Sequence, residues 1–132
     1  MLIYKTGNIL DDDADYIVNP VNCQCVMGAG LAKQFKEKFP KYWQEVQKRH
    51  KKYPQEIGKP QWFHTKSKYT SGDSERGIIN LPTKIRWSQP SRVEYVSTGL
   101  KDLQQAVHDI EWWHGIIKSI SFPKIGCGLG GL

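Results

Sequence analysis

Two neighbouring stretches decide the fold: Tyr16-Ile17-Val18-Asn19-Pro20-Val21-Asn22-Cys23 and, after a short gap, Met27-Gly28-Ala29-Gly30-Leu31-Ala32. Residues 16–20 are apolar through their middle, which is typical of a buried strand. A glycine-containing loop follows, and residues 31–39 then place Leu31, Phe35 and Phe39 on one face of a predicted helix. A buried strand, a glycine loop and an amphipathic helix in this order indicate an α/β fold.

The rest of the chain repeats this alternation. Pro40 ends the first helix and opens a second over residues 41–51. We predict short strands over residues 2–4, 61–69, 77–81 and 116–122, with a polar turn over 70–75. Apolar residues three and four apart predict a long helix over 93–111, capped by Ser91 or an adjacent residue, and Ser91 with Glu94 resembles a capping box at its start.

Length and composition limit the class of protein. A chain of 132 residues with 39% apolar content predicts one domain over residues 1–132. No apolar run is long enough for a membrane span, and the first residues turn polar too soon for a signal peptide, so we expect a cytoplasmic protein with no membrane partner. Three cysteines, Cys23, Cys25 and Cys127, form no disulfide framework and lack a second pair for zinc, so we expect no metal site.

The net charge of +6 suits a polyanionic partner, and it fits a soluble domain with a lysine-rich face equally well. The acidic run at residues 11–13 is better interpreted as a solvated turn than as a metal site.

Two glycine-rich loops are candidates for holding phosphates. One is residues 27–32, which open a helix, and the other is residues 125–131. Glycines let the backbone approach an anion closely, and a helix N-terminus supplies unpaired N–H groups. Neither loop is a Walker motif, and no helix follows the second loop within the chain, so a dinucleotide fingerprint is discounted. If both loops follow strands, they lie at the same edge of the sheet and hold a diphosphate between them.

Taken in order, four motifs resemble the macrodomain family. They are Gly7-Asn8-Ile9, Asn19-Pro20-Val21-Asn22, Met27 to Ala32, and Pro123-Lys124-Ile125-Gly126-Cys127-Gly128. The segment Asn80-Leu81-Pro82-Thr83-Lys84-Ile85-Arg86-Trp87, followed by Gln89-Pro90-Ser91-Arg92, is similar to the branch of this family formed by the DarG antitoxins. The resemblance implies a three-layer α/β/α fold with a mixed central sheet, truncated at its C-terminal end. It also implies a cleft for ADP-ribose and no further cofactor.

The resemblance assigns roles to particular residues. Asn8 and Ile9 would lie near the adenine, Asn22 would contact the distal ribose, and Lys84 would face the anomeric carbon of that ribose. The remaining ADP-ribose contacts would come from the two glycine loops and the residue before the lysine: Met27, Gly28, Ala29, Gly30, Leu31, Thr83, Ile125, Gly126, Cys127, Gly128, Leu129 and Gly130. Without the resemblance, Asn22 is as well interpreted as an Asn that satisfies its own turn, and Lys84 as a surface lysine after a strand.

The implied activity is hydrolysis of the N-glycosidic bond between ADP-ribose and a DNA base, which reverses the action of a DNA ADP-ribosyltransferase toxin. The alternatives are a reader that binds ADP-ribose without hydrolysis and a hydrolase of protein-linked ADP-ribose. Lys84 would act as a nucleophile after losing its proton, or as a cation that stabilises the leaving base. No carboxylate stands in the last glycine loop, which leaves no obvious general base.

Arg86, Trp87 and Arg92 combine cations with an aromatic ring, which suits contact with ADP-ribosylated single-stranded DNA. The alternative for Trp87 is packing beneath the long helix. Trp112 and Trp113 are assigned to the core and the helix end.

Overall fold

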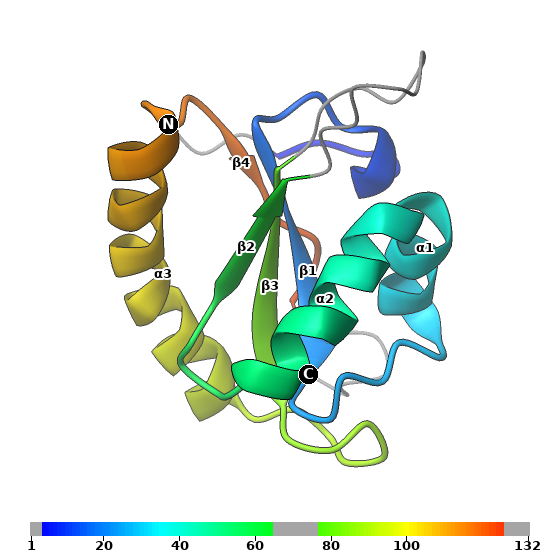
Figure 1. The fold of residues 1–132 in the computed structure, drawn as a ribbon. Helices are drawn as coiled ribbons and strands as arrows, with labels where there is room; N and C mark the ends of the chain where they lie inside the picture. The colour runs from blue at the N-terminus through cyan, green and yellow to red at the C-terminus, as the bar shows by residue number, and fades with distance from the viewer. Residues whose placement is uncertain (1–3, 65–76, 126–132) are drawn as a thin grey trace.

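The computed structural model describes residues 4–64 and 77–125. Its central sheet has four strands in the order β2-β3-β1-β4 (Figure 1). β1 pairs in parallel with β3 and β4, whereas β2 pairs antiparallel with β3, so the predicted mixed sheet is confirmed. The elements along the chain are η1 (Ile9–Asp11), β1 (Tyr16–Asn22), α1 (Gly30–Lys38), α2 (Pro40–Lys52), β2 (Gln61–His64), β3 (Gly77–Lys84), α3 (Val93–His114) and β4 (Ile120–Ser121).

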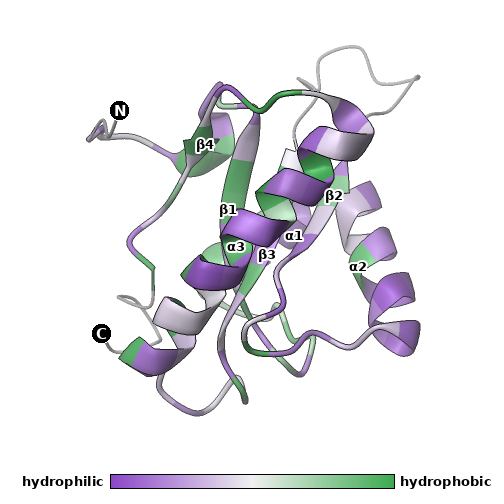
Figure 2. Cartoon of the chain, turned by 90° about the vertical axis from the view of Figure 1, so that its left-hand side faces the viewer, coloured by the Kyte–Doolittle hydropathy of each residue, from purple (hydrophilic) through white to green (hydrophobic). Residues whose placement is uncertain are grey.

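Helices cover both faces of the sheet, with α1 and α2 on one side and α3 on the other (Figures 1 and 2). Successive strand residues point to opposite faces, which divides the core in two. Ile17, Val21 and Ile78 pack with residues of α1 and α2. Val18, Ile79 and Leu81 pack instead with residues of α3. The predicted α/β/α layers are therefore confirmed.

Two predicted strands differ from the structure. Tyr4 lies in no strand and is 90% exposed, and the other two residues of that predicted strand are outside the described residues. The last strand shrinks from residues 116–122 to Ile120–Ser121. Residues 117 and 118 do not pair with the sheet, because the Ile117 N–H donates to the Glu111 carboxylate and the Lys118 N–H donates to the Asp15 carboxylate. The predicted strand beyond His64 and the turn at 70–75 also fall outside the described residues.

Both ends of α3 also differ from what the sequence predicts. The N-cap is Arg92 and no side chain caps the helix, so the predicted capping box is wrong. Ser91 is buried, and its hydroxyl has no partner among the described residues. Trp112 and Trp113 do lie at the helix end, but they are 79% and 71% exposed and are not part of the core.

The acidic run ends η1 instead of forming a separate turn, since Asp11 is the last residue of this short helix and Asp12 is its C-cap. Asp12 Oδ1 accepts a hydrogen bond from the Ala14 N–H at 2.9 Å, and Asp11 pairs with Lys38 at 2.7 Å. Over residues 4–64 and 77–125 no three potential metal ligands gather in one place. None of the helices in these ranges is long and apolar enough to cross a membrane.

Candidate functional site

Strands β1 and β3 end side by side, at the lower edge of the sheet in Figure 1. Asn22, the last residue of β1, is paired in register with Lys84, the last residue of β3. The Cys23 N–H then donates to the carbonyl oxygens of Lys84 and Ile85, at 3.1 and 3.2 Å. The loops that follow the two strands therefore start together. β4 runs parallel to β1, so the segment that leads to Ile125 heads toward this edge as well.

Asn22 organises the loop after β1. Its Oδ1 accepts hydrogen bonds from the N–H groups of Gln24 and Val26 at 3.0 and 3.1 Å, and its Nδ2 donates to the Val26 carbonyl at 2.8 Å. Cys25 sits within this loop at a φ of 60°, a left-handed conformation that costs a non-glycine residue about 1–3 kcal/mol. The structure thus shows the turn-forming role of Asn22, and its contact with a ribose stays a prediction.

The loop delivers the chain to the N-terminus of α1. Met27 is buried in the core beneath α1 and α2, whereas Gly28 and Ala29 are exposed. Ala29 is the N-cap, and it supplies no side-chain hydrogen bond to the helix. Gly30 follows at a φ of 60°, which glycine adopts without strain. An exposed helix start with no side-chain cap presents its first N–H groups to an anion, which is the geometry expected of a phosphate site.

Lys84 is half-buried at the end of β3, after the buried Thr83. Over residues 4–64 and 77–125 its ammonium forms neither an ion pair nor a hydrogen bond. A cation that is held at a strand end without a neutralising carboxylate is available to a ligand.

The three residues predicted to contact DNA follow β3 and lie on the surface of the molecule. Arg86 and Arg92 are exposed, and Trp87 is 60% exposed, which excludes packing of this indole beneath α3. The backbone N–H of Trp87 donates to Gln24 Oε1 at 3.0 Å and so links this loop to the loop after β1. The Arg92 guanidinium lies 5.8 Å from the ring centre of Tyr95.

The structure does not bring Asn8 and Ile9 to the edge formed by Asn22 and Lys84. Asn8 caps η1, the short dark-blue helix of Figure 1, by accepting a hydrogen bond from the Leu10 N–H at 3.0 Å. Ile9 packs against the core beneath α1 and α2. The Asp11–Lys38 ion pair joins η1 to the last turn of α1. A ligand that contacts both η1 and the sheet edge at Asn22 therefore has to extend along α1. Ile125 is half-buried against the core beneath α3, and the predicted contacts at Gly126, Cys127, Gly128, Leu129 and Gly130 lie outside the described residues.

Sequence reasoning missed a buried polar network beneath the site. Gln55 donates from Nε2 to the Asn22 carbonyl at 3.0 Å and accepts at Oε1 from Asn80 Nδ2 at 2.8 Å. The Tyr42 hydroxyl joins this network by donating to Asn80 Oδ1 and accepting from Asn19 Nδ2 at 2.8 Å. All four side chains are almost fully buried. The helical period identifies Tyr42 as a core residue, but no local pattern distinguishes Gln55 from the loop around it.

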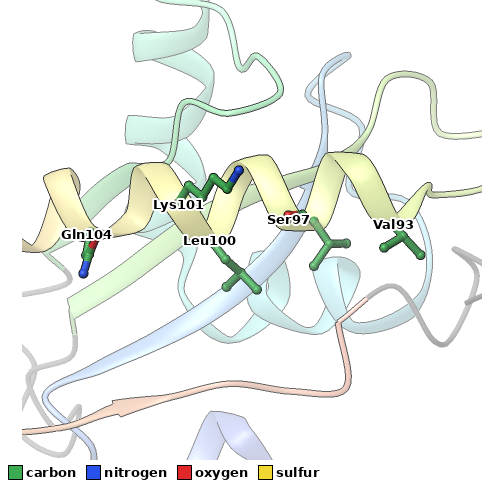
Figure 3. Close-up of a pocket in the computed structure, with 6 residues that line it drawn as sticks. Val93, Ser97, Leu100, Lys101 and Gln104 are labelled. Carbon is green, nitrogen blue, oxygen red and sulfur yellow. The ribbon is translucent and has the colours of Figure 1, made fainter.

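Two further features do not contribute chemistry to the site. Burial raises the pKa of the Cys23 and Cys25 thiols, which keeps both protonated and weakly nucleophilic. A groove of about 530 Å³ runs along α3 (Figure 3), but it belongs to one helix face and offers few polar groups. Its lining residues are Val93, Val96, Ser97, Leu100, Lys101 and Gln104.

The Macro domain family matches residues 18–132. A DNA ADP-ribosyl glycohydrolase of Mycobacterium tuberculosis is 36% identical over the whole chain, which spans about a third, 35%, of that relative's length.

Solved structures of macrodomains also resemble the chain. The macrodomain of Mycobacterium tuberculosis DarG superposes with a TM-score of 0.85 at 36% identity, over all of this chain and 81% of that one. Thermosipho africanus DarTG, solved in complex with ADP-ribose, gives a TM-score of 0.78 at 30% identity, over 96% of this chain and 33% of that one. The chain therefore belongs to the macrodomain family and, within that family, to the DarG type.

Proposed function

We propose that this domain is a DNA ADP-ribosyl glycohydrolase, which hydrolyses the N-glycosidic bond between ADP-ribose and a base of single-stranded DNA. The observation that carries the proposal is the placement of Lys84. Lys84 lies at a strand end, in register with Asn22, and its ammonium has no partner among the described residues. The similarity of the whole chain to the DarG macrodomain and to DarTG, which was solved in complex with ADP-ribose, supports this choice of ligand.

In the proposed complex the diphosphate binds at the N-terminus of α1, over residues 28–31. We assign the glycine loop 126–130, which lies outside the described residues, to the same diphosphate, and Asn22 and Thr83 to the distal ribose. Asn8 and Ile9 contact the adenine, so the ligand extends along α1 from the sheet edge toward η1. An anion at the helix N-terminus gains from the helix dipole and from the unpaired N–H groups.

Lys84 then acts on the bond that breaks. As an ammonium it hydrogen-bonds to the departing base and stabilises the electron pair that this base takes with it, while water adds to the anomeric carbon and its proton passes to the base. As a neutral amine it attacks that carbon, the base leaves with a proton, and water later releases the amine. Borohydride distinguishes the two, because it reduces an imine formed between Nζ and the opened ribose to a stable adduct that mass spectrometry detects.

The test of function is release of ADP-ribose from an ADP-ribosylated single-stranded oligonucleotide. We expect Lys84→Ala to slow release by at least about 100-fold, the usual cost of removing a group that stabilises developing charge. Calorimetry is expected to show nearly unchanged affinity for ADP-ribose. Lys101→Ala on α3 is the matched control, since Lys101 is an exposed lysine of the groove on α3.

The outcomes separate the candidate functions. Binding of ADP-ribose with no release from DNA or protein makes the domain a reader, and release from protein alone makes it a hydrolase of protein-linked ADP-ribose. Full activity of Lys84→Ala contradicts the assigned mechanism. We further propose that a DNA ADP-ribosyltransferase toxin generates the substrate. Restored growth of cells that express such a toxin, and loss of this rescue in Lys84→Ala, tests that partnership.

A further inference from the structure

The positive charge of the chain is concentrated on one pair of helices. Residues 30–52, which span α1 and α2, contain eight lysines and arginines and two glutamates, a net charge of +6. This equals the net charge of the whole chain, so all other residues together are neutral. The charge is therefore a property of one layer of the fold and not of the surface in general.

Several of these cations already have structural roles. Arg49 donates to the Trp62 carbonyl at 2.7 Å and stacks 4.0 Å from the ring centre of Phe63. Lys33 pairs with Glu37, and Lys38 pairs with Asp11. Lys48, Lys51 and Lys52 are different, because they are exposed in the last turns of α2 and form no ion pair with any described residue. Figure 2 shows this end of α2 as strongly hydrophilic.

The end of α2 lies at the same end of the molecule as the candidate site (Figure 1). Three residues after the helix, Gln55 donates to the Asn22 carbonyl and so seats the following segment against the end of β1. Tyr53 lies between them and is 60% exposed, with the Lys52 ammonium 5.5 Å from its ring centre. Exposed cations beside an exposed aromatic ring suit a single nucleic-acid strand, whose phosphates and bases they contact.

We propose that the C-terminal end of α2, comprising Lys48, Lys51, Lys52 and Tyr53, binds the phosphate backbone of the DNA that flanks the modified base. The inference rests on the proposed function, since it takes the substrate to be a DNA strand longer than the modified nucleotide. The helix dipole favours cations in a last turn. That effect explains neither the concentration of the whole net charge on this layer nor the exposed Tyr53 beside it.

The test is salt-dependent binding of an unmodified, fluorescent single-stranded oligonucleotide, followed by anisotropy. The variant Lys48→Gln/Lys51→Gln is compared with Lys101→Gln/Lys118→Gln, which removes two exposed lysines outside the basic layer. Each lost contact with single-stranded phosphate lowers the slope of log K against log salt by about 0.7, so we expect a reduction of about 1.4 in the first variant. The control keeps the slope of the original protein.

An activity ratio separates this inference from the function itself. For the first variant, kcat/KM on an ADP-ribosylated oligonucleotide is expected to fall relative to kcat/KM on a single ADP-ribosylated nucleoside. An unchanged salt slope, or an equal loss in the control, overturns the inference. So does weaker binding to polyglutamate with unchanged binding to DNA, which would assign this face to an acidic protein. If the unaltered protein releases ADP-ribose from no substrate, the proposed function fails, and the binding comparison still decides the role of α2.

Discussion

Replacing Tyr42 by Phe tests whether the buried polar network supports the sheet beneath the site. The Tyr42 hydroxyl accepts from Asn19 Nδ2 at 2.8 Å and donates to Asn80 Oδ1, and all three side chains are at most 1% exposed. Burial also raises the pKa of Tyr42, so the hydroxyl remains a donor. Tyr42→Phe keeps the ring between Phe35 and Phe63 and removes only the oxygen.

The expected magnitude follows from the groups that lose their partner. Asn19 Nδ2 and Asn80 Oδ1 would both be left unpaired in the core, at about 1–3 kcal/mol each, so we expect a loss of about 2–6 kcal/mol. Asn19 Oδ1 already lacks a partner among the described residues, so the substitution would add a second unpaired polar atom to this side chain. At roughly 3–4 °C per kcal/mol for a domain of this size, Tm falls by roughly 6–24 °C.

Urea unfolding followed by fluorescence measures this change. Tyr53→Phe is the matched control, since Tyr53 is 60% exposed, and surface substitutions usually change stability by less than about 0.5 kcal/mol. A Tyr42→Phe protein that is as stable as this control would refute the reasoning, because it would mean that the two amides find other partners at no cost.

Three further perturbations have expected outcomes. Gly77→Ala destabilises the fold by at least about 1–3 kcal/mol in the same unfolding assay, because a Cβ would stand 2.2 Å from the buried Tyr16 ring. Asn22→Ala frees the loop after β1 and lowers the affinity for ADP-ribose in calorimetry, with Asn8→Ala as a comparison at the other end of α1. Burial, with a smaller effect of the Asp15 charge, raises the pKa of Tyr16 to about 12 from 10.0. The unfolded chain therefore loses this proton at a lower pH than the folded protein does. A contribution of about 2–3 kcal/mol to the free energy of unfolding is fully present below pH 10 and is lost as pH rises toward 12. Tyr16→Phe removes this part of the pH dependence.

Elements with strong local patterns were predictable from the sequence. The helix over residues 31–39 and the one over 41–51 are confirmed within one residue at each end, because apolar spacing and Pro40 define them locally. The last strand was not predictable, since its apolar residues fit a strand but its N–H groups bond to Glu111 and Asp15 instead. Ile116 is accordingly 83% exposed. Tertiary contacts of this kind override a short apolar run.

The candidate site was predictable where a motif stands on one loop. Residues 27–31 lie at a helix N-terminus, as their glycines indicate. The contribution of Gln55 was not predictable, because it depends on a segment 33 residues away from Asn22. Nor could the sequence choose between the two positions of Trp87, which the structure places on the surface.

The alignment of Asn22 with Lys84 depends on an irregularity in the sheet. Val21 pairs with Pro82, but Asn22 pairs with Lys84, so Thr83 is an extra residue on β3 at this point. Pro82 has no N–H to donate, and the ladder is therefore weakened where the offset occurs. In a regular register Asn22 would lie opposite Thr83, and Lys84 would lie one residue further along the loop. The offset lets the lysine and the asparagine end their strands together, and bulges of this kind are common beside active sites because they redirect side chains. The same proline makes β3 difficult to extend from sequence, since a strand predicted to end at Leu81 in fact continues to the residue on which the proposed chemistry depends.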